Sequence, residues 1–191
     1  MRSYGFIESG KSPDDIILTE STDTKEYKRR PVTVVQDQGS EGSCVSQALW
    51  ELYNFRSKFN PRTDQFTSDP AWVFYQRKDK SLNGMTPREA LEIMKNNGMI
   101  SSYARITNIL ALKKAILANG GALVAMIAKS DNDDFWNGSS ILGGHAVAAI
   151  GYDNDNIYFK NSWGTEYGDN GEYYLPIDQF NVVTEAWTIM G

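Results

Sequence analysis

Apolar residues recur at helical spacing directly after position 44, and this pattern predicts the first helix. The residues on the apolar face are Val45, Ala48, Leu49, Leu52, Phe55 and Phe59. Residues three and four apart lie on the same side of a helix, so one face of this segment is expected to be buried. Ser43 is a suitable N-cap, which places Cys44 in the first helical turn.

Start and stop signals predict three further helices between residues 70 and 118. Pro70, after Ser68 and Asp69, opens a helix that runs through Tyr75, because proline is favoured at the first helical position. The segment 86–89 reads Thr-Pro-Arg-Glu, a capping box for a helix that stops at Gly98. A fourth helix covers roughly 108–118 and is closed by glycines.

Short apolar and β-branched runs replace this helical pattern after residue 121. They predict strands at 122–128, 145–152, 157–160, 172–175 and 186–190, in addition to a short extended run at 31–35. Helices therefore dominate the first half and strands the second, which favours an α+β fold with two unlike lobes.

The same pattern predicts how the chain is divided. We expect residues 1–28 to form an irregular N-terminal extension, since they are polar and charged. Residues 29–191 would form a single catalytic domain, with a helical lobe at about 38–103 and a β-rich lobe at about 104–191.

Composition narrows the class of protein. The chain has 191 residues, 41% of them hydrophobic, with a formal charge of -5 and a pI near 4.9. An acidic protein is a poor candidate for binding nucleic acid, which usually requires a basic face. No apolar run reaches the length of about 18 residues that a membrane span needs. One cysteine cannot form an internal disulfide, so we expect a cytoplasmic monomer, in the host cytoplasm if the protein is viral.

That single cysteine, Cys44, is the first candidate for chemistry. Only the thiolate attacks well, and a helix N-terminus favours the anion through its dipole and its free N–H groups. Gln38, six residues earlier, could form an oxyanion hole together with the backbone N–H of Cys44.

The single histidine, His145, could take the proton from the thiol and later give it to a leaving amine. Asn161 could fix the imidazole by accepting one ring N–H, and Trp163 could shield that bond from water. Each residue alone is better explained as structural, and only their joint occurrence favours catalysis. One Cys and one His are a poor zinc site, so no metal or cofactor is expected. The acidic segment 131–134 lacks the glycine and glutamate of a calcium loop and is expected to be a solvated surface loop.

Three motifs in this order resemble the signatures of papain-like cysteine peptidases. They are Gln38-Gly39-x-x-Gly42-Ser43-Cys44, Gly144-His145-Ala146-Val147 and Lys160-Asn161-Ser162-Trp163-Gly164. The resemblance covers about residues 31–191. It implies a helical lobe and a β-barrel-like lobe with the active site in the cleft between them. It also implies Cys44 as nucleophile, His145 as acid/base, Asn161 as orienting group and Gln38 as oxyanion donor.

The resemblance further implies substrate-binding residues and a reaction. Asn83 and Gly84 look like the glycine segment that pairs with substrate backbone in this family, and Gly144 and Trp163 flank the same site. The expected reaction is hydrolysis of peptide bonds in peptide or protein substrates, through a thiolate-imidazolium pair and a thioester acyl-enzyme. Acyl transfer or deamidation on the same fold, and a catalytically idle binding protein, remain as alternatives.

The N-terminal extension is too short for the usual inhibitory propeptide of this family. Its one apolar patch, residues 16–18, gives a hypothesis of its own: the patch packs on the body of the protein or lies in the cleft.

Overall fold

The computed structural model describes residues 2–19, 26–28, 31, 33–57 and 65–191. Several sequence predictions touch positions outside these ranges. They are Phe59 of the first helix, residue 32 of the extended run 31–35, residues 1 and 20–25 of the extension, and the expected boundary between extension and domain at 28–29.

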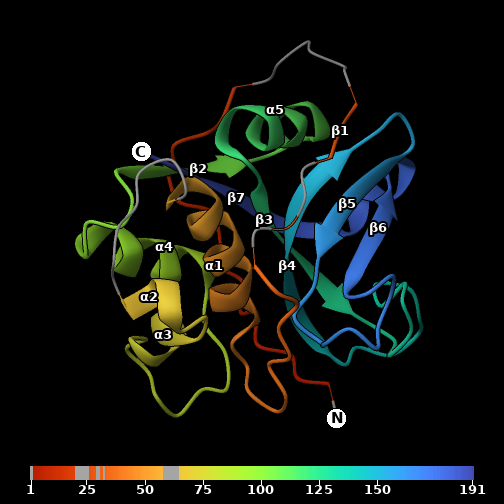
Figure 1. Ribbon diagram of the computed structural model, residues 1–191, viewed down its shortest axis with the longest axis horizontal. Coiled ribbons are helices and arrows are strands. Elements are labelled where there is room, and N and C mark those ends of the chain that lie inside the picture. Colours follow the sequence, from red (N-terminus) through yellow and green to blue (C-terminus); the bar gives the residue numbers. More distant parts are fainter. Residues whose placement is uncertain (1, 20–25, 29–30, 32, 58–64) are drawn as a thin grey trace.

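The helices lie together on one side of the molecule, left of the sheet in Figure 1. They are α1 (Cys44–Ser57), α2 (Gln65–Ser68), α3 (Trp72–Tyr75) and α4 (Pro87–Asn96), whereas α5 (Ile109–Asn119) packs on the sheet farther along the chain. Thr86 caps α4 by accepting the N–H of Glu89. Asn108 caps α5 in the same way, and Gly120 ends α5 in the left-handed conformation, with φ of 80°. The sequence predicted the cap at Thr86 and the glycine end of α5, whereas the cap at Asn108 was not predicted.

The strands form one antiparallel sheet. They are β1 (Tyr27–Lys28), β2 (Ser102–Ile106), β3 (Ala122–Ala128), β4 (Gly143–Tyr152), β5 (Asn156–Lys160), β6 (Glu172–Pro176) and β7 (Val183–Met190), with a 3-10 helix, η1 (Ile177–Val182), between the last two. The order is β2-β7-β3-β4-β5-β6, with β1 paired to β4. The α+β class is confirmed, but the sheet is not closed into a barrel.

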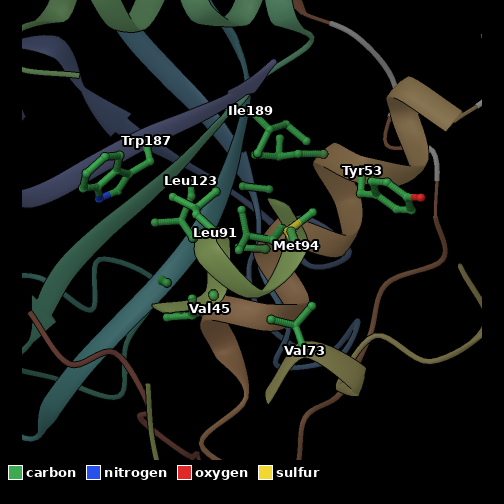
Figure 2. Packing of buried hydrophobic residues seen from close by; sticks show 14 of the residues in the cluster. Val45, Tyr53, Val73, Leu91, Met94, Leu123, Trp187 and Ile189 are labelled. Atoms are coloured by element: carbon green, nitrogen blue, oxygen red, sulfur yellow. The ribbon is translucent and has the colours of Figure 1, made fainter. Parts of the chain in front are cut away.

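Two apolar clusters hold these elements in place. The first joins the helices to one face of the sheet, and Figure 2 shows Val45, Leu91 and Met94 of the helices facing Leu123 and Trp187 of the strands. The second lies on the other face, under α5. Because α1 packs directly on β4 in the first cluster, its first residue, Cys44, is brought to the strand that carries His145.

Sequence periodicity found most elements and missed those with weak patterns. The predicted strands after residue 121 all form, within one to three residues at their ends. The short helix α2 and the strand β2 were not predicted. The run 31–35 is not a strand in its described residues, and β1 lies just before it. Residues 131–134 are exposed, as expected of a surface loop. Among the described residues, no helix combines the length and the apolar character that crossing a membrane requires.

Candidate active site

Cys44 is the first residue of α1, and its thiol is fully buried. Burial raises the pKa of the thiol to about 11, against the opposing effect of the backbone N–H groups of Ala146 and Gly5 that face the sulfur. One of these groups belongs to the residue next to His145. The sulfur therefore lies at the contact between α1 and β4, where the sequence placed it.

His145 and Asn161 form the hydrogen bond that the sequence predicted. The distance from the Nε2 atom of His145 to the Oδ1 atom of Asn161 is 2.7 Å. The same Oδ1 atom accepts the backbone N–H of Ser162 at 2.7 Å. Because an N–H group can only donate, this second bond identifies the amide oxygen of Asn161, and the oxygen requires a proton on Nε2 of His145. The lone pair of Nδ1 is therefore free, and this buried atom has no protein hydrogen-bond partner.

Aromatic rings enclose the imidazole of His145. Trp163 stacks on it with ring centroids 4.1 Å apart and an interplanar angle of 20°. Phe135, from the loop before β4, meets it edge-on at 5.2 Å. Burial lowers the pKa of His145 to about 3, although its hydrogen bond with Asn161 acts in the opposite direction. Sequence reasoning identified Trp163 and missed Phe135, which is 10 residues from His145 and belongs to no motif.

The side-chain amide of Gln38 is also held in one orientation. Its Oε1 atom accepts the hydroxyl of Ser162 at 2.6 Å. Its Nε2 atom donates to the carbonyl of Glu41 at 2.7 Å and approaches the carbonyl of Ser3 at 3.4 Å. The indole N–H of Trp163 donates to the same carbonyl of Ser3 at 3.3 Å. A backbone carbonyl of the N-terminal segment therefore lies against the predicted oxyanion donor.

The N-terminal segment covers this site. We call residues 3–7 the covering segment. The N–H of Phe6 donates to the carbonyl of Gly144 at 2.9 Å, on the sheet side. On the helical side, the N–H of Met85 donates to the carbonyl of Gly5 at 2.9 Å, and the N–H of Ile7 donates to the carbonyl of Met85 at 3.1 Å. Backbone bonds to both sides thus hold the covering segment over Cys44.

Glycines make this close backbone approach possible. A Cβ atom on Gly5 would stand 1.9 Å from the carbonyl oxygen of Gly42. A Cβ atom on Gly84 would stand 2.6 Å from the carbonyl of Gly5, and one on Gly144 would stand 2.3 Å from the carbonyl of Phe6. Side chains at any of these positions would push the two backbones apart.

Comparison with known proteins now identifies the family. The model of the papain family of cysteine proteases matches residues 75–185, more than half of the chain, and these residues include His145 and Asn161. The chain belongs to the papain family. Cys44 and Gln38 lie outside the matched residues, but alignments with individual relatives cover more of the chain.

The relatives of this papain-family protein come from viruses, plants and protists. An uncharacterised peptidase-like protein of Acanthamoeba polyphaga mimivirus is 22% identical over 98% of this chain and 86% of its own length. Papain from Carica papaya is 27% identical over 82% of this chain, and a cathepsin B-like protein of Giardia intestinalis is 27% identical over 80%. The chain spans 54% of the length of these last two relatives.

Solved structures show the same fold. Xylellain, a cysteine protease from Xylella fastidiosa, aligns with a TM-score of 0.82 at 18% identity, over 98% of this chain and 95% of its own. A cysteine protease of Carica candamarcensis in complex with E-64 aligns with a TM-score of 0.63 at 21% identity, over 84% and 93%. Together these findings confirm a papain-family cysteine peptidase, a hydrolase, and they do not favour acyl transfer or an idle scaffold.

Three of the four predicted substrate-binding residues contact the covering segment, and the fourth supports the loop before Cys44. Gly144 and Trp163 bind it directly, and Gly84 lies against the carbonyl of Gly5. Asn83 instead accepts the N–H of Gly42 at 2.7 Å and supports the loop before Cys44. Met85 supplies the backbone bonds on the helical side. Sequence reasoning missed it, although it directly follows Gly84.

The apolar patch at residues 16–18 packs on the body of the protein, the first of the two options above. Ile17 pairs with Arg105 of β2 in a parallel bridge. Leu18 is partly buried against the second apolar cluster, whereas Ile16 and Ile17 are about half exposed. The segment that covers the site is therefore residues 3–7, which the sequence did not single out.

Proposed function

We propose that Cys44 is the nucleophile of this peptidase and that His145 is its acid/base. The observation that supports this most directly is the tautomer of His145. Its Nε2–H is committed to Asn161, so Nδ1 is the atom that can accept the thiol proton. Asn161 is then the orienting group, because it fixes both the proton position and the plane of the ring.

The reaction would proceed in two steps. His145 first takes the thiol proton of Cys44, and the resulting thiolate then forms a bond to the carbonyl carbon of the scissile peptide, whose oxygen takes the negative charge. His145 then gives that proton to the leaving amine as the C–N bond breaks, which leaves a thioester on Cys44. Water, deprotonated by His145, attacks the thioester and releases the acid and the free thiol.

Gln38 would stabilise the oxyanion of both tetrahedral intermediates. In support, its Nε2–H points at a backbone carbonyl oxygen of the covering segment, and its amide is held by Ser162. A donor fixed in this way costs no reorganisation when charge develops on the substrate oxygen.

Substrate peptides would occupy the place that the covering segment now fills. Gly144 and Met85 already bind an extended backbone from opposite sides, and Gly84 leaves room for it. Burial under the covering segment favours the neutral forms of Cys44 and His145, so the thiolate-imidazolium pair would form only when this segment leaves and water enters. Peptides and unfolded proteins are the substrate class that fits.

Hydrolysis of a fluorogenic peptide library tests this assignment. Cys44→Ala is expected to abolish turnover while thermal unfolding stays close to that of the parent protein, since it removes a single side-chain atom. His145→Ala is also expected to abolish turnover, but it removes a buried ring that packs on Trp163 and Phe135 and should lower the unfolding temperature. Turnover at the parent rate in Cys44→Ala, with the fold intact, would reject Cys44 as nucleophile. A mass spectrum of the parent protein trapped with substrate should show the acyl group on the peptide that contains Cys44.

Cytoplasmic location and a monomeric state stay predictions. So does the division into an extension, residues 1–28, and a single domain, residues 29–191.

A further inference from the structure

The covering segment continues into a second stretch that is held by charged groups instead of glycines. We call residues 9–18 the clasp. It begins two residues after Ile7, where the covering segment ends. In Figure 1 the N-terminal trace, in red, runs from the lower edge of the molecule up to β2 and α5. The clasp binds residues of α4, β2 and β7, whereas the covering segment lies over Cys44.

Asp15 is the centre of the clasp. Its side chain is 4% exposed, and it bonds with two arginines at once. The Nη2 atom of Arg88 donates to both carboxylate oxygens, at 2.8 and 2.9 Å, and its Nε atom donates to Oδ1 at 3.3 Å. The Nη1 atom of Arg105 lies 3.3 Å from Oδ2. Two nitrogen atoms of the Arg88 guanidinium thus face the two carboxylate oxygens, which is the strong geometry for such a pair.

The same arginines also bind the backbone of the clasp. Arg88 donates to the carbonyl of Ser9 at 2.7 Å and to that of Gly10 at 2.9 Å. Arg105 donates to the carbonyl of Gly10 at 2.6 Å. The N–H of Ser9 is bound by the carboxylate of Glu185 at 2.9 Å. The site thus binds an aspartate side chain together with the peptide backbone around it, and not a carboxylate alone.

The two arginines are built into rigid elements and depend on an anion. Arg88 lies in the first turn of α4 and Arg105 in β2, and both guanidinium groups face the ring of Trp187, at 5.5 and 5.2 Å from its centroid. The side chain of Arg105 is only 8% exposed. Since both cations approach one carboxylate, its removal would leave two like charges close together in a partly buried place.

We propose that Arg88 and Arg105 form a regulatory carboxylate site whose occupant, Asp15 of the same chain, keeps the covering segment over Cys44. The proposal rests on the function proposed above, because it regulates access to that site. Its ligand class is an aspartate-bearing extended peptide.

The length of chain that tethers the covering segment to the body determines how much more often Cys44 is exposed when the charged contacts of the clasp are lost. With the clasp bound, the covering segment is tied to the body within about 2 residues, between Ile7 and Ser9. When the bonds to Asp15 and to the backbone of residues 9 and 10 are lost, the next described attachment is Ile16, whose carbonyl accepts the N–H of Arg105 at 2.6 Å, about 9 residues from Ile7. Effective concentration falls roughly as the three-halves power of tether length, so a tether about four to five times longer lowers it roughly tenfold. Loss of these charged contacts should therefore expose Cys44 about ten times more often.

Alkylation of Cys44 in the full chain tests this directly, because no other cysteine competes for the reagent. Asp15→Asn keeps the shape of the side chain and removes its charge, and we expect a roughly tenfold faster reaction with iodoacetamide at pH 7.5. Asp14→Asn is the matched control: Asp14 is exposed and adjacent, and its variant should react at the parent rate. Arg88→Lys keeps the charge but loses the two-pronged geometry, and it should also react faster.

The possible outcomes distinguish a failure of the proposed carboxylate site from a failure of the proposed peptidase activity. Parent-rate alkylation in both Asp15→Asn and Arg88→Lys would overturn the carboxylate site, even if the same preparations hydrolyse peptides. Faster alkylation in both without any peptide hydrolysis would leave the site standing and remove the proposed function. If Asp15→Asn unfolds, which thermal unfolding shows, Arg88→Lys decides the matter. Alkylation that slows as protein concentration rises would assign the occupant to a second copy and overturn the assignment to the same chain.

Discussion

Gly5→Ala is the sharpest test of the covering segment. The added Cβ atom would stand 1.9 Å from the carbonyl oxygen of Gly42, and the next two atoms it meets, at 2.2 and 2.5 Å, also belong to the backbone of Gly42. No flexible side chain can move to relieve the overlap. The covering segment must shift by about 1.5 Å to reach an ordinary contact of 3.4 Å.

A shift of that size would break the bonds that hold the segment. The three backbone hydrogen bonds around Phe6 and Met85 measure 2.9, 2.9 and 3.1 Å, and each would exceed 4 Å if the segment moved away along it. A typical hydrogen bond contributes about 1 kcal/mol net, so their loss amounts to about 3 kcal/mol. Since about 1.4 kcal/mol is a factor of ten, the open form should become roughly a hundred times more populated.

Alkylation of Cys44 at low reagent concentration measures this population, as long as the segment opens and closes faster than the thiol reacts. Gly39→Ala is the matched control. Gly39 lies in the loop before Cys44 with φ of 57°, so alanine there is strained, but nothing lies within 4 Å of its Cβ position. The reasoning fails if Gly5→Ala is folded and is alkylated no faster than the parent protein or Gly39→Ala.

Three further predictions concern catalysis, the core and pH. Gln38→Ala is expected to lower kcat about 100- to 1000-fold with little change in KM, measured by steady-state hydrolysis, because its bond strengthens on the developing oxyanion; a change in KM alone would assign Gln38 to substrate binding. Lys160→Met should lower the free energy of unfolding by about 3–5 kcal/mol, measured by denaturant unfolding, since Lys160 and Glu51 bond at 3.1 Å with both side chains 1% exposed. The double variant Lys160→Met, Glu51→Leu should recover most of that loss, because no buried charge is left unpaired. Losses of the two single variants that simply add in the double variant would contradict this. Burial acts to raise the pKa of Asp15, but hydrogen bonds from Arg88, the N–H of Ser12 and Arg105 outweigh it and hold that pKa below its ordinary value. Tyr103 lies near Asp15, and Glu185 binds the N–H of Ser9 in the same clasp. The clasp should therefore stay bound above about pH 4 and loosen only below it, and amide exchange of residues 9–18 that accelerates between pH 7 and 5 would contradict that expectation.

The candidate catalytic residues could be proposed from sequence because their signals are local and chemically restrictive. A single thiol at a predicted helix start, a single imidazole before a predicted strand and an amide two residues before an indole leave few other reactions open. The helix cap at Thr86 could be predicted for the same reason, since a capping side chain bonds a backbone N–H three residues away. The cap at Asn108 obeys the same rule but was not predicted.

Features that depend on contacts between distant residues could not be predicted in this way. Phe135 reaches His145 only because its loop folds back over β4. Asp15 finds Arg88 and Arg105 across 73 and 90 residues of chain. No local pattern encodes such pairings, because what selects them is burial of charge and ring surface in the folded protein.

By itself, the sequence determined the order of helices and strands, the α+β class and the residues proposed to break a peptide bond, since each follows from spacing and side-chain chemistry. Only the tertiary structure decided that the sheet stays open, which ring nitrogen of His145 is free, and that residues 3–7 lie over Cys44. These depend on which surfaces meet, and a backbone that carries glycines on both sides of a contact can approach as closely as residues 3–7 do here.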